Sequence, residues 1–131
     1  MPTEILILAL GCVLLLVHIQ VAIHKKTQQY GTDWNMGARD KDMPPLNDVA
    51  ARLERASANF RETFPIAIVT LFGVVVADKT GPITAIAGWV WLAARVVYLP
   101  LYWSGVEKWR TVVFGISALA LLALIGVLLF G

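Results

Sequence analysis

Four polar residues recur at helical spacing near the middle of the chain, and they are the side chains best suited to chemistry. Steps of three, four and three residues separate Arg52, Arg55, Asn59 and Glu62. At about 100° per residue, these steps place all four within an arc of about 80° on one face of a helix. The spacing therefore predicts a polar stripe along an otherwise apolar helix.

A second stripe follows about 40 residues later in the chain. Arg95, Tyr98 and Tyr102 are separated by steps of three and four residues, and Trp91 lies one turn earlier on the same side. Tyrosine hydroxyls can donate hydrogen bonds to a ligand, and the rings can pack against it. Two helices thus offer polar faces that are able to converge.

Positively charged candidates outnumber negatively charged ones. The positive candidates are Arg52, Arg55, Arg95 and Arg110, and the negative candidate is Glu62. The planar, forked guanidinium of arginine suits carboxylates and phosphates. The excess of positive charge predicts a site for an acidic, amphipathic ligand. A structural alternative remains open, in which Glu62 neutralises one arginine, Asn59 completes the hydrogen bonds, and the resulting buried network only holds the helices together.

The elements that carry these residues are predicted to be membrane-spanning helices. The 131 residues are 58% hydrophobic and only 15% charged, and the mean hydropathy is +0.70. The apolar residues gather into runs long enough to cross about 30 Å of hydrocarbon. We expect one domain, residues 1–131: an all-α, integral membrane four-helix bundle with helices at about 4–24, 49–77, 83–103 and 109–130. Asn47 or Asp48 is expected to cap the second helix.

The bilayer constrains where the polar stripes can point. An arginine near the bilayer centre costs on the order of 3 kcal/mol on insertion scales. Arg95 lies in the middle of its predicted helix, and several such groups facing lipid would offset much of a small protein's stability. Both stripes are therefore expected to turn inward or into an interface between proteins.

The distribution of charge predicts the orientation of the chain. Lysines and arginines gather in the first and third connections (Lys25, Lys26, Arg39, Lys41, Lys108 and Arg110), whereas the second connection carries Lys79 alone. An even number of crossings puts the first and third connections on one side. The positive-inside rule places both in the cytoplasm and both termini outside.

Several functions and roles are disfavoured by the composition. A net charge of +2 is too small to indicate a nucleic-acid partner, and no Cys/His spacing indicates a metal site. The single cysteine, Cys12, is expected to be a small buried apolar residue, and His18 a buried, hydrogen-bonded packing residue. A proton-coupled drug exporter of similar size would need an acid in the middle of the first helix, where Val13 to Val17 provide none.

At this point the residues resemble a known family. The run from Arg55 through Asn59 and Glu62 to Phe64-Pro65 resembles the second-helix signature of the MAPEG family, the membrane-associated proteins in eicosanoid and glutathione metabolism. Arg95-Val-Val-Tyr98 with Tyr102 is similar to the family's third-helix arginine and aromatic pair. Arg110-Thr111 resembles the arginine before the fourth helix, and Arg39 resembles the loop arginine of the small bacterial members.

This resemblance implies a homotrimer of four-helix protomers in a bacterial inner membrane. It implies a glutathione site between neighbouring subunits near the cytoplasmic face. Carried across, Arg55 would hold a carboxylate of glutathione, Asn59 its peptide and Glu62 its α-amino group. Tyr98 and Tyr102 would line the cavity, and Arg52, Arg95 and Arg39 would add positive charge.

For the reaction, Arg110 is the candidate group that stabilises the thiolate, assisted by Tyr102. A free thiol with a pKa of about 8.5 is only about 3% ionised at pH 7. The implied function is a glutathione-dependent transferase or peroxidase that acts on lipophilic electrophiles dissolved in the membrane. Thr63 stands where the eicosanoid enzymes commonly have tyrosine, so a non-catalytic, lipid-binding or accessory membrane subunit is the alternative.

Overall fold

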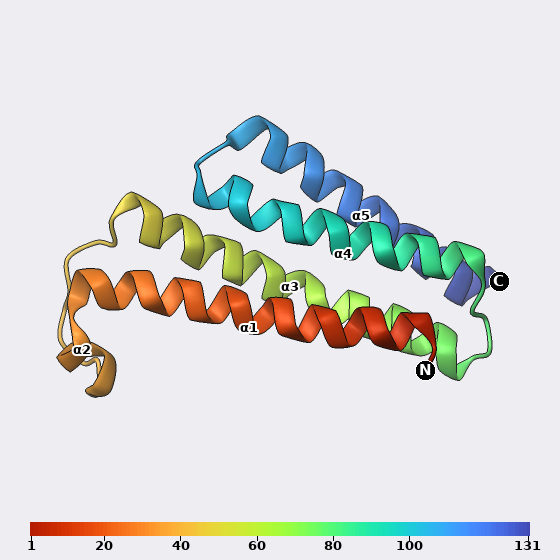
Figure 1. Ribbon diagram of the computed structural model, residues 1–131, viewed down its shortest axis with the longest axis horizontal. Helices are drawn as coiled ribbons and strands as arrows, with labels where there is room; N and C mark the ends of the chain where they lie inside the picture. Colours follow the sequence, from red (N-terminus) through yellow and green to blue (C-terminus); the bar gives the residue numbers. More distant parts are fainter.

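The computed structural model describes all residues, 1–131, and is entirely helical (Figure 1). Its helices are α1 (Thr3–Tyr30), α2 (Thr32–Met36), α3 (Asp48–Val76), α4 (Pro82–Trp103) and α5 (Glu107–Phe130). All four long helices are long and apolar enough to cross a membrane. The predicted fold class, an all-α integral membrane four-helix bundle, is confirmed.

The four long helices form two antiparallel pairs, α1 with α3 and α4 with α5 (Figure 1). The connection that contains α2 and the connection between α4 and α5 lie at the same end of the bundle. Both chain termini and the short turn between α3 and α4 lie at the opposite end. Most of the positive charge of the connections is therefore gathered at the first end, and Lys79 lies at the other.

The helix ends differ from the predicted bounds most clearly at α1, which continues to Tyr30 instead of ending near His24. The added residues contain neither glycine nor proline, and the Thr27 hydroxyl donates to the Ile23 carbonyl, so nothing stops the helix until Gly31, whose φ is 96°. The first connection, expected to be a loop, also contains the short helix α2. Asn47 caps α3 as predicted, because its side chain accepts from the Ala50 amide.

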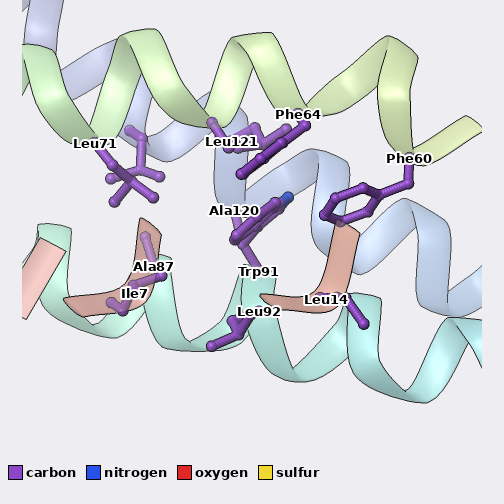
Figure 2. Packing of buried hydrophobic residues seen from close by; sticks show 12 residues of the cluster. Ile7, Leu14, Phe60, Phe64, Leu71, Ala87, Trp91, Leu92, Ala120 and Leu121 are labelled. Atoms are coloured by element: carbon purple, nitrogen blue, oxygen red, sulfur yellow. The ribbon is translucent and has the colours of Figure 1, made fainter. Parts of the chain in front are cut away.

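The core is an aromatic stack in the middle of the bundle (Figure 2). The rings of Phe64 and Trp91 lie at 4° to each other with centroids 6.0 Å apart, and Phe60 continues the stack toward the end that carries the connections. Ile7 and Leu14 of α1 belong to the same buried cluster and pack beside the rings (Figure 2). The stack joins α3 to α4 beside the polar stripes, because Phe60 and Phe64 lie within two residues of Asn59 and Glu62 in the sequence and Trp91 lies one turn before Arg95.

Much of the outer surface of the four long helices is apolar. Leucine, isoleucine and valine side chains are exposed along all four long helices, which indicates that the hydrocarbon of a bilayer covers them. Cys12 is among the exposed residues, so the expectation that it is buried is wrong. It lies on the outer side of α1, whereas Gly11 beside it takes the inward position.

Close helix packing depends on Gly11. A Cβ atom added at this position would lie 2.9 Å from the Phe64 ring and 3.3 Å from the Trp91 ring. Neither ring can retreat easily, because each is held by the other in the stack. A side chain at Gly11 would therefore push α1 away from the core.

We predict that Gly11→Val lowers the free energy of unfolding by about 1–3 kcal/mol, the range for overpacked cores. The measurement is thermal unfolding of the purified protein in detergent. Gly126→Val is the matched control, because an added Cβ atom at Gly126 meets no atom within 4 Å. Equal effects of the two substitutions would contradict the close packing of α1 on the stack.

Candidate functional site

A pocket of about 400 Å³ opens between α3, α4 and α5. It lies near the end of the bundle that carries α2 and the connection between α4 and α5. It is lined by residues of all three helices: Arg55, Ala58, Asn59, Glu62, Tyr98, Tyr102, Arg110, Thr111 and Phe114. Six of these are predicted site residues. The structure thus brings most of the two polar stripes together around one space, which we call the main pocket.

Helix geometry explains how these side chains meet. Arg55, Asn59 and Glu62 lie one turn apart on α3, and Tyr98 and Tyr102 lie one turn apart on α4. Arg110 lies in the first turn of α5, because the short connection after Trp103 returns the chain directly beside α4. Each helix therefore contributes one inward face, with its polar part toward the end of the bundle that carries the connections.

Tyr102 contacts two arginines in the main pocket. The Nε atom of Arg55 donates to the Tyr102 hydroxyl at 3.2 Å. The Arg110 guanidinium lies 4.4 Å from the centre of the Tyr102 ring. Both arginines thus contact the same tyrosine, one at its hydroxyl and one at its ring, and both line the main pocket. This arrangement can hold anionic groups at two separate points of one ligand.

Arg95 lies beneath the main pocket instead of lining it, which differs from the expectation that it points into the ligand space. Its side chain is only 1% exposed. The Nη1 atom donates to Asn59 Oδ1 at 2.8 Å, and the guanidinium lies 4.3 Å from the centre of the Tyr98 ring. Arg95 therefore lies under the main pocket and contacts two residues that line it, Asn59 and Tyr98.

Glu62 is exposed in the main pocket and has no ion-pair partner. The one ion pair of the chain joins Lys26 and Glu54 at 2.7 Å, on another face of α3. The structural alternative required Glu62 to neutralise an arginine inside a buried network. The described geometry instead leaves this carboxylate free to bind a positively charged group.

Arg52 lines an adjoining polar pocket of about 370 Å³. Its Nε atom donates to the Trp103 carbonyl at 3.2 Å, which fixes the end of α4. The adjoining pocket shares Arg55, Tyr102 and Arg110 with the main pocket. Arg52 therefore lies one turn from the predicted ligand groups, toward the connection between α4 and α5.

Arg39 is the one predicted site residue that lies away from this region. Its guanidinium lies 4.6 Å from the centre of the Trp34 ring, and it donates to the Asn35 carbonyl. Together with Lys26, Ser57 and Arg61 it lines a separate pocket of about 350 Å³ between α1 and α3. Arg39 and Arg55 therefore line pockets on different faces of α3.

Ala58, Thr111 and Phe114 line the main pocket but were not among the predicted site residues. Helical spacing could have identified two of them, because Ala58 lies between Arg55 and Glu62 at steps of three and four, and Phe114 follows Arg110 by four.

His18 is fully buried and stacks on Phe60 at 4.9 Å, but neither ring nitrogen has a hydrogen-bond partner. The packing role expected of His18 is confirmed, and the expected hydrogen bond is not found.

Comparison with known protein families matches residues 4–130 to the MAPEG family, which is nearly the whole chain. No individual curated protein and no solved structure matches the chain.

We predict that Glu62→Gln changes the free energy of unfolding by no more than about 0.5 kcal/mol, the usual range for an exposed residue without special contacts. Thermal unfolding of the purified protein measures this change. Loss of more than about 2 kcal/mol would show that the Glu62 carboxylate holds helices together, as expected of a buried pair that loses one partner.

Proposed function

The chain belongs to the MAPEG family, and we propose that it is a glutathione-dependent transferase or peroxidase that acts on lipophilic electrophiles in the membrane. The observation that carries the proposal is the grouping of two arginines, one unpaired carboxylate and one amide in the main pocket.

The charges of the main pocket complement those of glutathione. Glutathione carries two carboxylates, one ammonium group and a thiol, and the pocket offers Arg55 for a carboxylate, the free carboxylate of Glu62 for the ammonium group and Arg110 for the ionised thiol. Arginine binds carboxylates through paired N–H groups, and charge-assisted hydrogen bonds are the stronger ones. The volume of about 400 Å³ lies in the range of pockets that hold small molecules.

Each lining residue has a proposed role. Arg55 holds a carboxylate of glutathione, Asn59 bonds its peptide and Glu62 takes its α-amino group. Arg110 stabilises the thiolate, and lowering the thiol pKa by about two units requires about 2.7 kcal/mol of preferential stabilisation. The Tyr102 hydroxyl, already an acceptor for Arg55, can donate its own proton toward the sulfur. The thiol proton leaves to water. In the transferase reaction the thiolate sulfur then bonds to an electrophilic carbon, and the bond from this carbon to its leaving group breaks, so that the leaving group departs with the electron pair.

The proposed assembly is a homotrimer with the site between subunits, and it would explain the position of Arg39. The pocket that contains Arg39 lies on another face of α3 from the main pocket. A neighbouring subunit packed against α3 would bring its Arg39 beside the main pocket of the first. The composite site would then hold three arginines against Glu62.

The proposed orientation puts the main pocket at the cytoplasmic face of a bacterial inner membrane. The connections that contain α2 and that join α4 to α5 carry most of the lysines and arginines, and they lie at the same end of the bundle. Glutathione would enter from the water, and the second substrate would enter from the lipid beside α5.

Thr63 favours the alternative of a non-catalytic lipid-binding or accessory subunit. Its hydroxyl donates within its own helix, to the carbonyls of Asn59 and Phe60, and it does not line the main pocket. Thr63 thus supplies no group for the reaction. A protein that binds an acidic lipid but forms no glutathione conjugate with lipophilic electrophiles would support this alternative.

We predict that the purified protein binds glutathione and that Arg55→Ala and Glu62→Ala each weaken binding by about 10- to 100-fold. Each substitution removes one charge-assisted hydrogen bond, worth about 1.5–3 kcal/mol. Isothermal titration calorimetry measures the dissociation constants. Lys108→Ala is the matched control, because it removes a positive charge two residues from Arg110 without changing the lining. Absence of binding by the wild-type protein at millimolar glutathione would refute the proposal.

We also predict complementation between subunits. When Arg39→Ala and Arg55→Ala chains assemble in equal amounts, about a quarter of the sites of a cyclic trimer receive an intact pocket and an intact Arg39. Glutathione binding by the mixed protein should recover in that proportion. A mixture of Arg55→Ala and Glu62→Ala chains is the control and should recover none, because both residues line one pocket. Equal behaviour of the two mixtures would mean that Arg39 does not complete a neighbour's site.

A further inference from the structure

We infer that Arg95 is a positioning residue: it fixes the Asn59 amide so that its N–H₂ group, and not its oxygen, faces the main pocket. The site would then require an acceptor, such as a peptide carbonyl, from its ligand at this point. This role rests on the proposed function and specifies how the glutathione peptide is recognised.

The surroundings of Arg95 hold it in place. The side chain is 1% exposed, and its guanidinium lies 5.2 Å from the centre of the Phe60 ring, 4.3 Å from that of Tyr98 and 5.8 Å from that of Phe114. Aromatic faces attract a guanidinium and attract it more strongly when water is excluded. Rings from α3, α4 and α5 thus surround the charge and leave it little freedom to move.

Asn59 provides the one side-chain acceptor for this buried cation. Nη1 of Arg95 donates to Asn59 Oδ1 at 2.8 Å, whereas Nε and Nη2 are buried without a hydrogen-bond partner. A buried group that loses its partner carries the full penalty of desolvation, which is larger for charged groups. Arg95 therefore binds the Asn59 oxygen strongly.

The amide cannot turn over without losing this bond. Arginine has only donors, and the asparagine nitrogen also has only donors. A reversed amide would set N–H against N–H and leave Arg95 without any side-chain acceptor. Because the oxygen is directed toward Arg95, the N–H₂ group is the part of Asn59 that is available to the main pocket, which Asn59 lines.

This orientation determines what the main pocket can recognise. Arg55 and Arg110 donate, and the Asn59 N–H₂ group donates one turn from Arg55 along α3. The Glu62 carboxylate, one turn further along α3, is the lone charged acceptor. A matching ligand therefore carries a carbonyl or carboxylate oxygen between its terminal carboxylate and its ammonium group.

Asn59→Asp separates positioning from stability. The new carboxylate would keep an acceptor for Arg95 but remove the N–H₂ donor, so the melting temperature should stay at or above that of the wild type. Glutathione binding should weaken about tenfold or more, measured by calorimetry well below the melting temperature. Asn59→Ala is the comparison and should lose both binding and thermal stability. Wild-type affinity in Asn59→Asp would overturn the inference.

Variants of Arg95 test the same bond from the other side. Arg95→Met should weaken glutathione binding although the protein remains folded, and Arg95→Lys, which keeps a donor for Asn59 Oδ1, should restore part of the affinity. Equal affinities of the two variants would contradict positioning by hydrogen bond.

If the wild type does not bind glutathione, the proposed function fails. The inference then depends on melting temperatures, and an Asn59→Asp variant no more stable than Asn59→Ala would refute it.

Discussion

A guanidinium in the middle of a membrane-spanning helix has to be surrounded by protein, and this requirement at Arg95 determines how α3, α4 and α5 face one another. Phe60, Tyr98 and Phe114 cover the cation from three helices, and Asn59 supplies its acceptor. Once those residues meet, the next turn of each helix toward the connections is aligned as well. Arg55, Tyr102 and Arg110 are then gathered above Arg95, so the main pocket is a consequence of how this one charge is buried.

Much of this arrangement could be predicted from the sequence, because the bilayer leaves few alternatives. Apolar runs of sufficient length predict the spanning helices, and the spacing of Arg55, Asn59 and Glu62 predicts a shared face. The cost of exposing such groups to lipid predicts that the face turns inward. Family membership was visible in the same residues and is supported by the match over residues 4–130.

Other features could not be obtained from periodicity. Arg95 shares the phase of Tyr98, which lines the main pocket, yet it lies beneath the pocket because it is deeper in the bundle and reaches toward Asn59. The position of Arg39 depends on a connection whose path is set by α2 and by bonds to the Asn35 carbonyl. The predicted end of α1 near His24 assigns Lys25 and Lys26 to the first connection, but lysine is also a good helix former, and the helix continues to Tyr30.

The length of α3 has a consequence for how two reactants of unlike solubility could meet. Its 29 residues extend about 43 Å, some 13 Å more than the hydrocarbon thickness. The extra length allows the first turns of α3, which carry the arginines, to lie in the headgroup layer, while the rest of the helix lies in the hydrocarbon. A lipophilic reactant is concentrated in that oil by partitioning, so its effective concentration at the protein depends on membrane volume. For the proposed reaction, the apparent affinity for such a reactant would therefore follow the lipid-to-water ratio of the sample as well as the chemistry of the protein.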